Sequence, residues 1–235
     1  MIKFYYHTSP NPAKVALYLE EAGLAYEPIP VDTRRGDQHS PAYLALNPNA
    51  KTPTIVDGDT VVFDSTAILL YLSEICGKFL PANAPAARAP MHSWLLFVAS
   101  GIGPYCGQAV HFKHFVPKPD AYALNRYDFE AWRHWGIIDT HLTKCPYMLG
   151  EAYSLVDMAV WGWARAVPRI LGSGAWEKLP NVARLFQEIN DRPAAKRVES
   201  LMTRHAFKTE VDDEARTFLF PQNARLIPPG VEARS

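Results

Sequence analysis

The spacing of hydrophobic residues changes partway along the chain. Short β-branched and aromatic runs, typical of strands, occur only in the first third, at Ile2–Tyr6, Tyr26–Val31, Thr54–Val56 and Val61–Phe63. Beyond about residue 90, apolar residues recur at intervals of three and four, which is typical of one face of a helix. The pattern therefore predicts a mixed α/β half followed by an all-helical half.

Helical signals separate the early strands. Val15, Leu19 and Ala22 share a helical face, and Gly23 stands at the C-cap position. Ser40-Pro41 has the N-cap and first-turn residues of a short helix that should end by Asn47-Pro48. The resulting order, strand-helix-strand and then helix-strand-strand-helix, predicts a thioredoxin-like domain with a right-handed crossover.

The stretch from Ala50 to Tyr71 organises the first half. It contains a strand opened by Pro53, an Asp57-Gly58 hairpin, a returning strand and an Asp64-Ser65 helix N-cap. Such an edge leaves the backbone of Thr52 free, and the helix N-terminus beside it favours a carboxylate. The pattern indicates a site for a small anionic peptide; the alternative is a plain hairpin followed by a capped helix.

In the second half, one helical stripe comprises Leu124, Tyr127, Ala131, Trp135, Ile138 and Leu142. Ser154 to Asp157 has the form of a capping box before a segment that is apolar nearly all round, which predicts a buried central helix. We expect a thioredoxin-like domain at 1–79, an Ala/Pro-rich linker at 80–90, a helical-bundle domain at 91–205 and a tail at 206–235. The tail contains Pro221, Pro228 and Pro229 and is expected to lie over the surface or to be partly disordered.

Composition narrows the function classes. The 24 basic and 24 acidic side chains cancel, so no general attraction to nucleic acid or to an anionic membrane is expected. Cys76, Cys106 and Cys145 form no CxxC pair, which gives no reason to expect a metal site or a protein dithiol and fits a reducing cytoplasm. The N-terminus does not have the form of a signal peptide, and no stretch approaches the roughly 20 apolar residues of a membrane span.

The order Thr-Pro, hairpin, Asp-Ser and helix resembles the glutathione site of the glutathione transferase superfamily. The resemblance implies a cis peptide bond at Pro53, pairing of the Thr52 backbone with the cysteinyl unit of glutathione, and binding of the γ-glutamyl group by Asp64 and Ser65. In the family an apolar β-branched residue usually precedes the proline, and Glu is common where Asp64 stands. Both departures are compatible with glutathione binding, because Thr52 would act through its backbone and Asp64 keeps the negative charge.

Further motifs resemble the bacterial nu class of this superfamily. They are Ser-Pro-Asn-x-x-Lys from Ser9, Gly-Asp-Gln from Gly36, the segments 46–57 and 103–112, and Asn125-Arg126-Tyr127. The resemblance adds Gln38 and Lys51 to the glutathione-binding residues, together with Arg126 acting across the interface of a homodimer. It implies that Tyr105, Gln108, His111 and Phe112 lie near the pocket for the second substrate. Members of this class bind glutathione disulfide or two glutathiones, and many reduce small disulfides without a redox cysteine.

Glutathione chemistry requires the thiolate, which a hydrogen-bond donor and a helix dipole can stabilise. In this fold the donor comes from the loop after the first strand, where Ser9 and Asn11 are the candidates and Thr8 is third. Tyr5 and Tyr6 lie too early, inside the strand. The alternative is that these polar residues only cap the following helix.

The resemblance therefore implies a glutathione-dependent enzyme that reduces small disulfides, with conjugation left open, and the cysteine content adds the expectation of a cytoplasmic protein. One alternative is glutathione-dependent cleavage of ethers or halides. Another is a non-catalytic binding module, against which the intact Ser9, Asn11, Thr52-Pro53 and Asp64-Ser65 argue, since a module has no need of them.

Overall fold

A four-stranded mixed sheet forms the centre of the first half, in the order β2-β1-β3-β4. In the computed structural model, which describes residues 1–226, β1 (Ile2–Tyr6) pairs in parallel with β2 (Tyr26–Pro30) and antiparallel with β3 (Thr54–Asp57). Strand β3 pairs antiparallel with β4 (Thr60–Phe63). This is the thioredoxin-like arrangement that the order of elements predicts.

Helices α1 (Pro10–Ala22), α2 (Pro41–Leu46) and α3 (Ser65–Cys76) and the short η1 (Asp37–His39) accompany the sheet. Helix α1 begins at Pro10 because Ser9 adopts the extended N-cap conformation and a proline is well suited to the first helical position. It ends at Gly23, whose φ of 69° favours glycine. Ser40 caps α2 by accepting a hydrogen bond from the Tyr43 amide, as the Ser-Pro pattern predicts.

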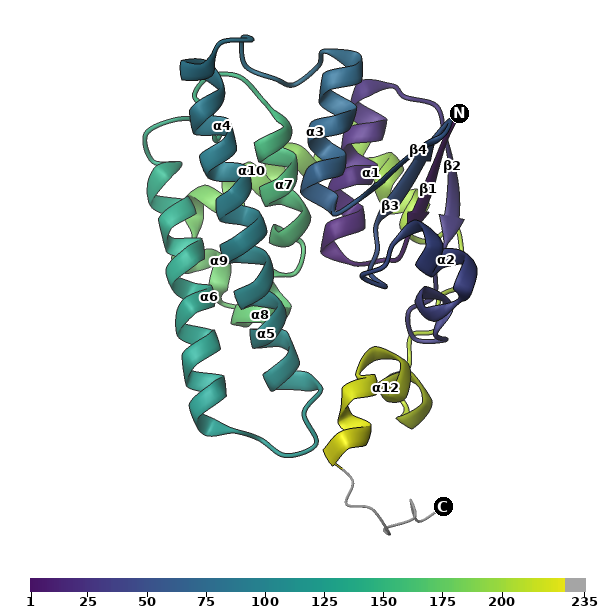
Figure 1. The fold of residues 1–235 in the computed structure, drawn as a ribbon. Helices are drawn as coiled ribbons and strands as arrows, with labels where there is room; N and C mark the ends of the chain where they lie inside the picture. Colours follow the sequence, from purple (N-terminus) through teal and green to yellow (C-terminus); the bar gives the residue numbers. More distant parts are fainter. Residues whose placement is uncertain (227–235) are drawn as a thin grey trace.

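The second half is helical in the part of the chain that the structure describes (Figure 1). Its elements are α4 (Pro85–Phe97), the π-helical segment η2 (Val98–Ile102), α5 (Gly103–His114), α6 (Ala121–His141), α7 (Leu155–Ala164), α8 (Val167–Leu171), α9 (Ala175–Lys178), α10 (Pro180–Asn190) and α11 (Pro193–Met202). Helix α4 starts inside the segment 80–90 expected as a linker, because Pro85 suits a first helical position and alanines follow it. Within residues 1–226, no helix is both long and apolar enough to cross a membrane.

Helix α7 lies at the centre of the molecule. All ten of its residues are buried, and it packs against α1, α3, α4 and α10. The capping box at its start is present as predicted, with Ser154 and Asp157 satisfying each other's backbone amides. A helix buried on every side can be apolar all round, which explains the uniform composition of the segment.

The C-terminal segment is more ordered than the sequence suggests. It forms α12 (Asp213–Leu219) and η3 (Pro221–Leu226), drawn in yellow below α2 in Figure 1. The carbonyl of Phe218 accepts a hydrogen bond from Gln38, and Arg216 donates to the Phe115 carbonyl. These tertiary contacts stabilise a helix of only seven residues, which is too short to be stable alone. Pro228 and Pro229 lie outside the described residues.

Candidate functional site

Most of the residues expected to bind glutathione line two adjoining cavities. A cavity of about 510 Å³, here called the loop cavity, is lined by Ser9, Asn11, Gln38, Lys51 and Thr52 among others. A cavity of about 290 Å³ at the start of α3, here called the α3 cavity, is lined by Asn11, Lys51, Asp64 and Ser65 together with Lys14. Because Asn11 and Lys51 line both cavities, one extended ligand can contact residues of both.

The loop before β3 presents an unpaired backbone to the loop cavity. The Thr52–Pro53 peptide bond is cis. The Lys51 carbonyl accepts hydrogen bonds from the Tyr43 hydroxyl and from the Asn47 side-chain nitrogen, both at 2.7 Å. Neither backbone polar group of Thr52 has a hydrogen-bond partner within residues 1–226. The loop is therefore held from behind and free to pair with an extended peptide.

Asp64 and Ser65 shape the N-terminus of α3. Asp64 is the N-cap, and its Oδ1 accepts from the amides of Thr66 at 2.8 Å and Ala67 at 3.1 Å. Its φ of 70° lies in the left-handed region, a strained conformation for a residue other than glycine. The Ser65 side chain is buried and has no hydrogen-bond partner among the described residues. The capping that the sequence predicts thus leaves the Ser65 hydroxyl available to a ligand.

Ser9 and Asn11 present polar groups from the start of α1. Ser9 occupies the N-cap position, yet its side chain makes no capping hydrogen bond. The Oδ1 of Asn11 accepts from Nε1 of Trp163 on α7 at 3.1 Å. Because an indole N–H can only donate, this contact fixes the amide with its NH₂ group turned away from Trp163. Capping therefore does not consume either side chain, and both retain a hydrogen-bond donor.

Gln38 lies at the edge of the loop cavity beneath the C-terminal segment. It is buried, and its side-chain nitrogen donates to the carbonyls of Thr33 at 3.1 Å and Phe218 at 3.2 Å. Its Oε1 is buried without a partner. The C-terminal segment therefore competes with any ligand for the Gln38 amide.

A third cavity of about 380 Å³, here called the arginine cavity, adjoins Ser9 on the other side. It is lined by His7, Thr8, Ser9, Pro10, Arg34, Gly107, Val110, Phe115, Trp163, Arg165, Ala166 and Arg169. Burial beside Arg34 lowers the pKa of His7 to about 4, so this histidine is neutral at physiological pH. None of the three arginines is marked by a local motif. Arg34 comes from the loop between β2 and η1, whereas Arg165 and Arg169 reach the cavity through the packing of the end of α7 and of α8 near the Ser9 loop.

None of the four residues expected near the second-substrate pocket lines the loop, α3 or arginine cavity. The Tyr105 ring packs at 4.9 Å from that of His134, and Phe112 stacks at 5.2 Å on Tyr127, both toward α6. His111 packs against Phe220 of the C-terminal segment, and Gln108 is exposed. The residues of α5 that line the three cavities are instead Gly103, Pro104, Gly107 and Val110. Gly103, Gly107 and Val110 lie at helical spacing, which could have identified this face from the sequence.

Arg126 does not line any of these cavities in its own chain. It lies on α6, half-exposed, and its Nη1 pairs with Oε1 of Glu130 at 2.7 Å. Glu130 also accepts from Nε of Arg133 at 2.8 Å. Within one subunit Arg126 is therefore part of a surface ion-pair cluster.

The cysteines lie apart from the three cavities. All are free thiols, and none lines the loop, α3 or arginine cavity. Burial raises the pKa of Cys106 to about 12, so this thiol stays protonated at neutral pH. None of these cysteines is placed to act as a redox nucleophile at the site.

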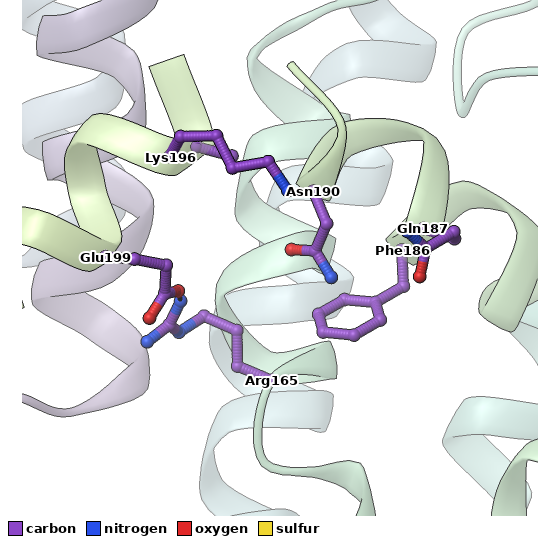
Figure 2. A pocket seen from close by; sticks show the side chains of 7 residues that line it. Arg165, Phe186, Gln187, Asn190, Lys196 and Glu199 are labelled. Carbon is purple, nitrogen blue, oxygen red and sulfur yellow. Dashed lines mark hydrogen bonds and ion pairs between the residues drawn. The ribbon is translucent and has the colours of Figure 1, made fainter. Parts of the chain in front are cut away.

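A further depression of about 410 Å³ lies between α7, α10 and α11 (Figure 2). It is lined by Arg165, Phe186, Gln187, Asn190, Ala195, Lys196 and Glu199. Arg165 pairs with Glu199, and Asn190 accepts from the Trp161 indole at 2.8 Å. Its principal polar groups already have partners, and none of the expected site residues lies in it.

Comparison with known proteins agrees with this geometry. Residues 8–75 match the family model of the glutathione S-transferase N-terminal domain, and residues 130–193 match that of the C-terminal domain. The disulfide-bond oxidoreductase YfcG of Escherichia coli is 39% identical over 201 residues, covering 83% of this chain and 92% of YfcG. The disulfide-bond oxidoreductase YghU of the same organism is 33% identical over 215 residues, covering 83% and 73% of the two chains.

Solved structures give the same result at the level of the fold. A glutathione transferase family member from Pseudomonas fluorescens, with two glutathione bound, has a TM-score of 0.79 and 36% identity over 84% of this chain and 91% of that one. A glutathione transferase from Pseudomonas putida, with one glutathione disulfide bound per subunit, has a TM-score of 0.79 and 33% identity over 87% and 92% of the chains. The thioredoxin-like half, the helical half and both family models together show that this chain belongs to the glutathione transferase family.

Proposed function

We propose that this protein is a glutathione-dependent disulfide oxidoreductase that uses the sulfur of glutathione itself. The observation that carries the proposal is the donor pair at the start of α1, the Ser9 hydroxyl and the Asn11 amide, beside the unpaired Thr52 backbone. The names of YfcG and YghU, both disulfide-bond oxidoreductases, support the same reaction class.

Glutathione would lie across the loop and α3 cavities. Its cysteinyl unit pairs with the backbone of Thr52, and its γ-glutamyl group reaches Asp64 and Ser65. This direction brings the thiol toward Ser9 and Asn11. A free thiol has a pKa of about 8.5, and each unit by which the site lowers it corresponds to about 1.4 kcal/mol of thiolate stabilisation.

The reaction consists of two thiol–disulfide exchanges. The thiolate of glutathione attacks one sulfur of a small disulfide, forms a mixed disulfide and releases the other half as a thiolate. The thiolate of a second glutathione then attacks the glutathione sulfur of the mixed disulfide, giving glutathione disulfide and releasing the second half. Two glutathiones are oxidised, one disulfide is reduced by two electrons, and the released thiolates take up the protons.

In this proposal the protein acts as a cytoplasmic homodimer. Arg126 would exchange its contact with Glu130 for a carboxylate of glutathione bound to the second subunit, for which a guanidinium fork is well suited. The alternative is an ordinary solvated arginine. A monomer by light scattering at micromolar concentration would exclude the cross-subunit contact.

The proposal is tested by comparing two variants in glutathione-dependent reduction of a small disulfide. The Cys76→Ser/Cys106→Ser/Cys145→Ser variant should keep most of the rate, because none of these thiols lines the site. In Asn11→Ala the rate of disulfide reduction should fall roughly tenfold, as expected for the loss of one hydrogen bond to a charged group.

Loss of turnover in the cysteine-free variant, with glutathione binding retained, would mean that a protein thiol carries the reaction. An aryl halide and an aryl ether assayed beside the disulfide test the alternative chemistries. A rate with either substrate that exceeds the rate with the disulfide would contradict the proposed reaction.

A further inference from the structure

Lys14 is a buried cation that no part of the proposed reaction uses. It lies on α1, is 1% exposed, and has no hydrogen-bond or ion-pair partner within residues 1–226. Helices α3, α7 and α11 pack around α1, and Lys14 lines the α3 cavity with Asn11, Asp64 and Ser65. The α3 cavity is thus the place where an external group can reach this side chain.

The packing of α7 fixes the stem of Lys14. A Cβ added at Gly162 would lie 2.8 Å from Cβ of Lys14 and 2.7 Å from the carbonyl oxygen of Pro10. The two helices therefore touch almost backbone to backbone at this point, which only glycine at position 162 allows. The lysine has no room to turn toward α7.

A buried ammonium without a partner costs free energy, so a bound anion that pairs with it is favoured. The groups around Lys14 indicate where that anion would lie. Burial lowers the pKa of Lys14 to about 8, while the carboxylate of Asp64 opposes the shift. Lys51 also lines the cavity and adds a second positive charge. The N-terminus of the 12-residue helix α3 and the unpaired Ser65 hydroxyl favour an anion at the same place.

We propose that Lys14 binds the α-carboxylate of the γ-glutamyl residue of glutathione, from the α1 side of the α3 cavity. The inference rests on the proposed function, in which this end of glutathione reaches Asp64 and Ser65. Asp64 is then left for the ammonium group of the same residue, and Lys14 supplies the charge that neutralises the carboxylate. The lysine is a binding residue and takes no part in the sulfur exchange.

The test combines a protein variant with a ligand variant. Lys14→Met keeps most of the side-chain volume and removes the charge; Lys3→Met, at an exposed position on β1, is the matched control. The ligands are glutathione and 4-aminobutyryl-cysteinylglycine, which lacks only the carboxylate in question. By calorimetry, Lys14→Met should bind glutathione about ten- to a hundredfold more weakly, as expected for a lost charge-assisted contact. It should bind the analogue within about twofold of the unchanged protein by the same arithmetic.

An equal loss for both ligands would mean that Lys14 acts on the thiolate or on the fold, and an unchanged affinity for glutathione would mean that it makes no contact. Either result overturns the inference and leaves the proposed function standing. Failure of the unchanged protein to bind glutathione would instead overturn the proposed function.

A second measurement needs no variant and covers the case in which Lys14→Met does not fold. In lysine ¹³Cε NMR, Lys14 should stand out by a low titration midpoint, because burial lowers its pKa. Saturating S-methylglutathione, which has the carboxylate but no thiol, should raise that midpoint. The S-methylated 4-aminobutyryl analogue should not, and an equal response to both ligands would contradict the proposed contact.

Discussion

At the scale of single residues, the site depends on contacts that decide which atoms remain free. Asn11 could point its amide either way, and only the Trp163 indole, 152 residues later in the chain, selects the orientation. Ser9 stands at an N-cap but leaves its hydroxyl unused. Both proposed thiolate donors are thus available: Trp163 orients the Asn11 amide, and the Ser9 hydroxyl makes no capping hydrogen bond.

Trp163→Phe tests this positioning. The change keeps an aromatic ring and removes the indole N–H, so the Asn11 amide is free to rotate. We expect kcat for disulfide reduction to fall roughly tenfold, corresponding to about 1.4 kcal/mol, with little change in KM for glutathione.

Trp161→Phe is the matched control, since it removes an indole N–H on the same helix that donates to Asn190 instead. A similar loss of kcat in both variants would attribute the effect to the packing of α7 rather than to the orientation of Asn11.

At the scale of elements, the start of α7 determines the position of Trp163. Asp157 is fully buried and accepts from the amides of Met148 at 2.7 Å and Ser154 at 2.8 Å, and from the Ser154 hydroxyl at 2.8 Å. It therefore fixes both the first turn of the helix and the loop before it. Burial raises the pKa of Asp157 to about 6, so the hydrogen bonds offset only part of the cost of burying the charge.

Asp157→Ala should lower the free energy of unfolding by about 3 kcal/mol, because three buried donors lose their acceptor. Asp157→Asn should cost less, since its carbonyl oxygen still accepts part of this set. Urea unfolding followed by circular dichroism measures both. Equal stability of the alanine variant and the unchanged protein would show that the capping box is not needed for the fold.

At the scale of the whole molecule, His7 joins the loop after β1 to the segment that follows α11. It is buried between Asp32 and Phe207, with Nε2 4.0 Å from Oδ1 of Asp32 and its ring 4.7 Å from that of Phe207. Its pKa of about 4 lies below the ordinary value of 6.5, because burial and Arg34 disfavour the imidazolium. The folded protein therefore binds fewer protons at this residue than the unfolded chain does between pH 4 and 6.5.

Stability from His7 is consequently present above pH 6.5 and is lost as the pH falls toward 4. At about 1.4 kcal/mol per unit, the loss amounts to about 3 kcal/mol across this range. Urea unfolding at pH 7, 5.5 and 4.5 should show a shallower decline for His7→Asn than for the unchanged protein. Parallel curves would mean that His7 is not kept neutral in the folded state.

The sequence by itself determined the features that depend on neighbouring residues. The two-residue hairpin loop, the Gly23 C-cap of α1, the N-caps of α2 and α3 and the capping box of α7 each depend on a few neighbouring residues, so composition and spacing predict them. The Thr-Pro and Asp-Ser elements of the candidate site are equally local, and the resemblance to glutathione transferases suggests their role. Only the tertiary structure decided which atoms meet from distant segments. The packing of α7 on α1 orients Asn11 and buries Lys14, and the return of the chain after α11 brings Phe218 to Gln38, 180 residues away. Contacts between distant segments also bring the three arginines together near Ser9 and stabilise the helix in the C-terminal segment. No local pattern encodes these contacts, because they depend on how complete helices pack. The type of a residue, such as Lys14, does not by itself reveal that the fold buries it.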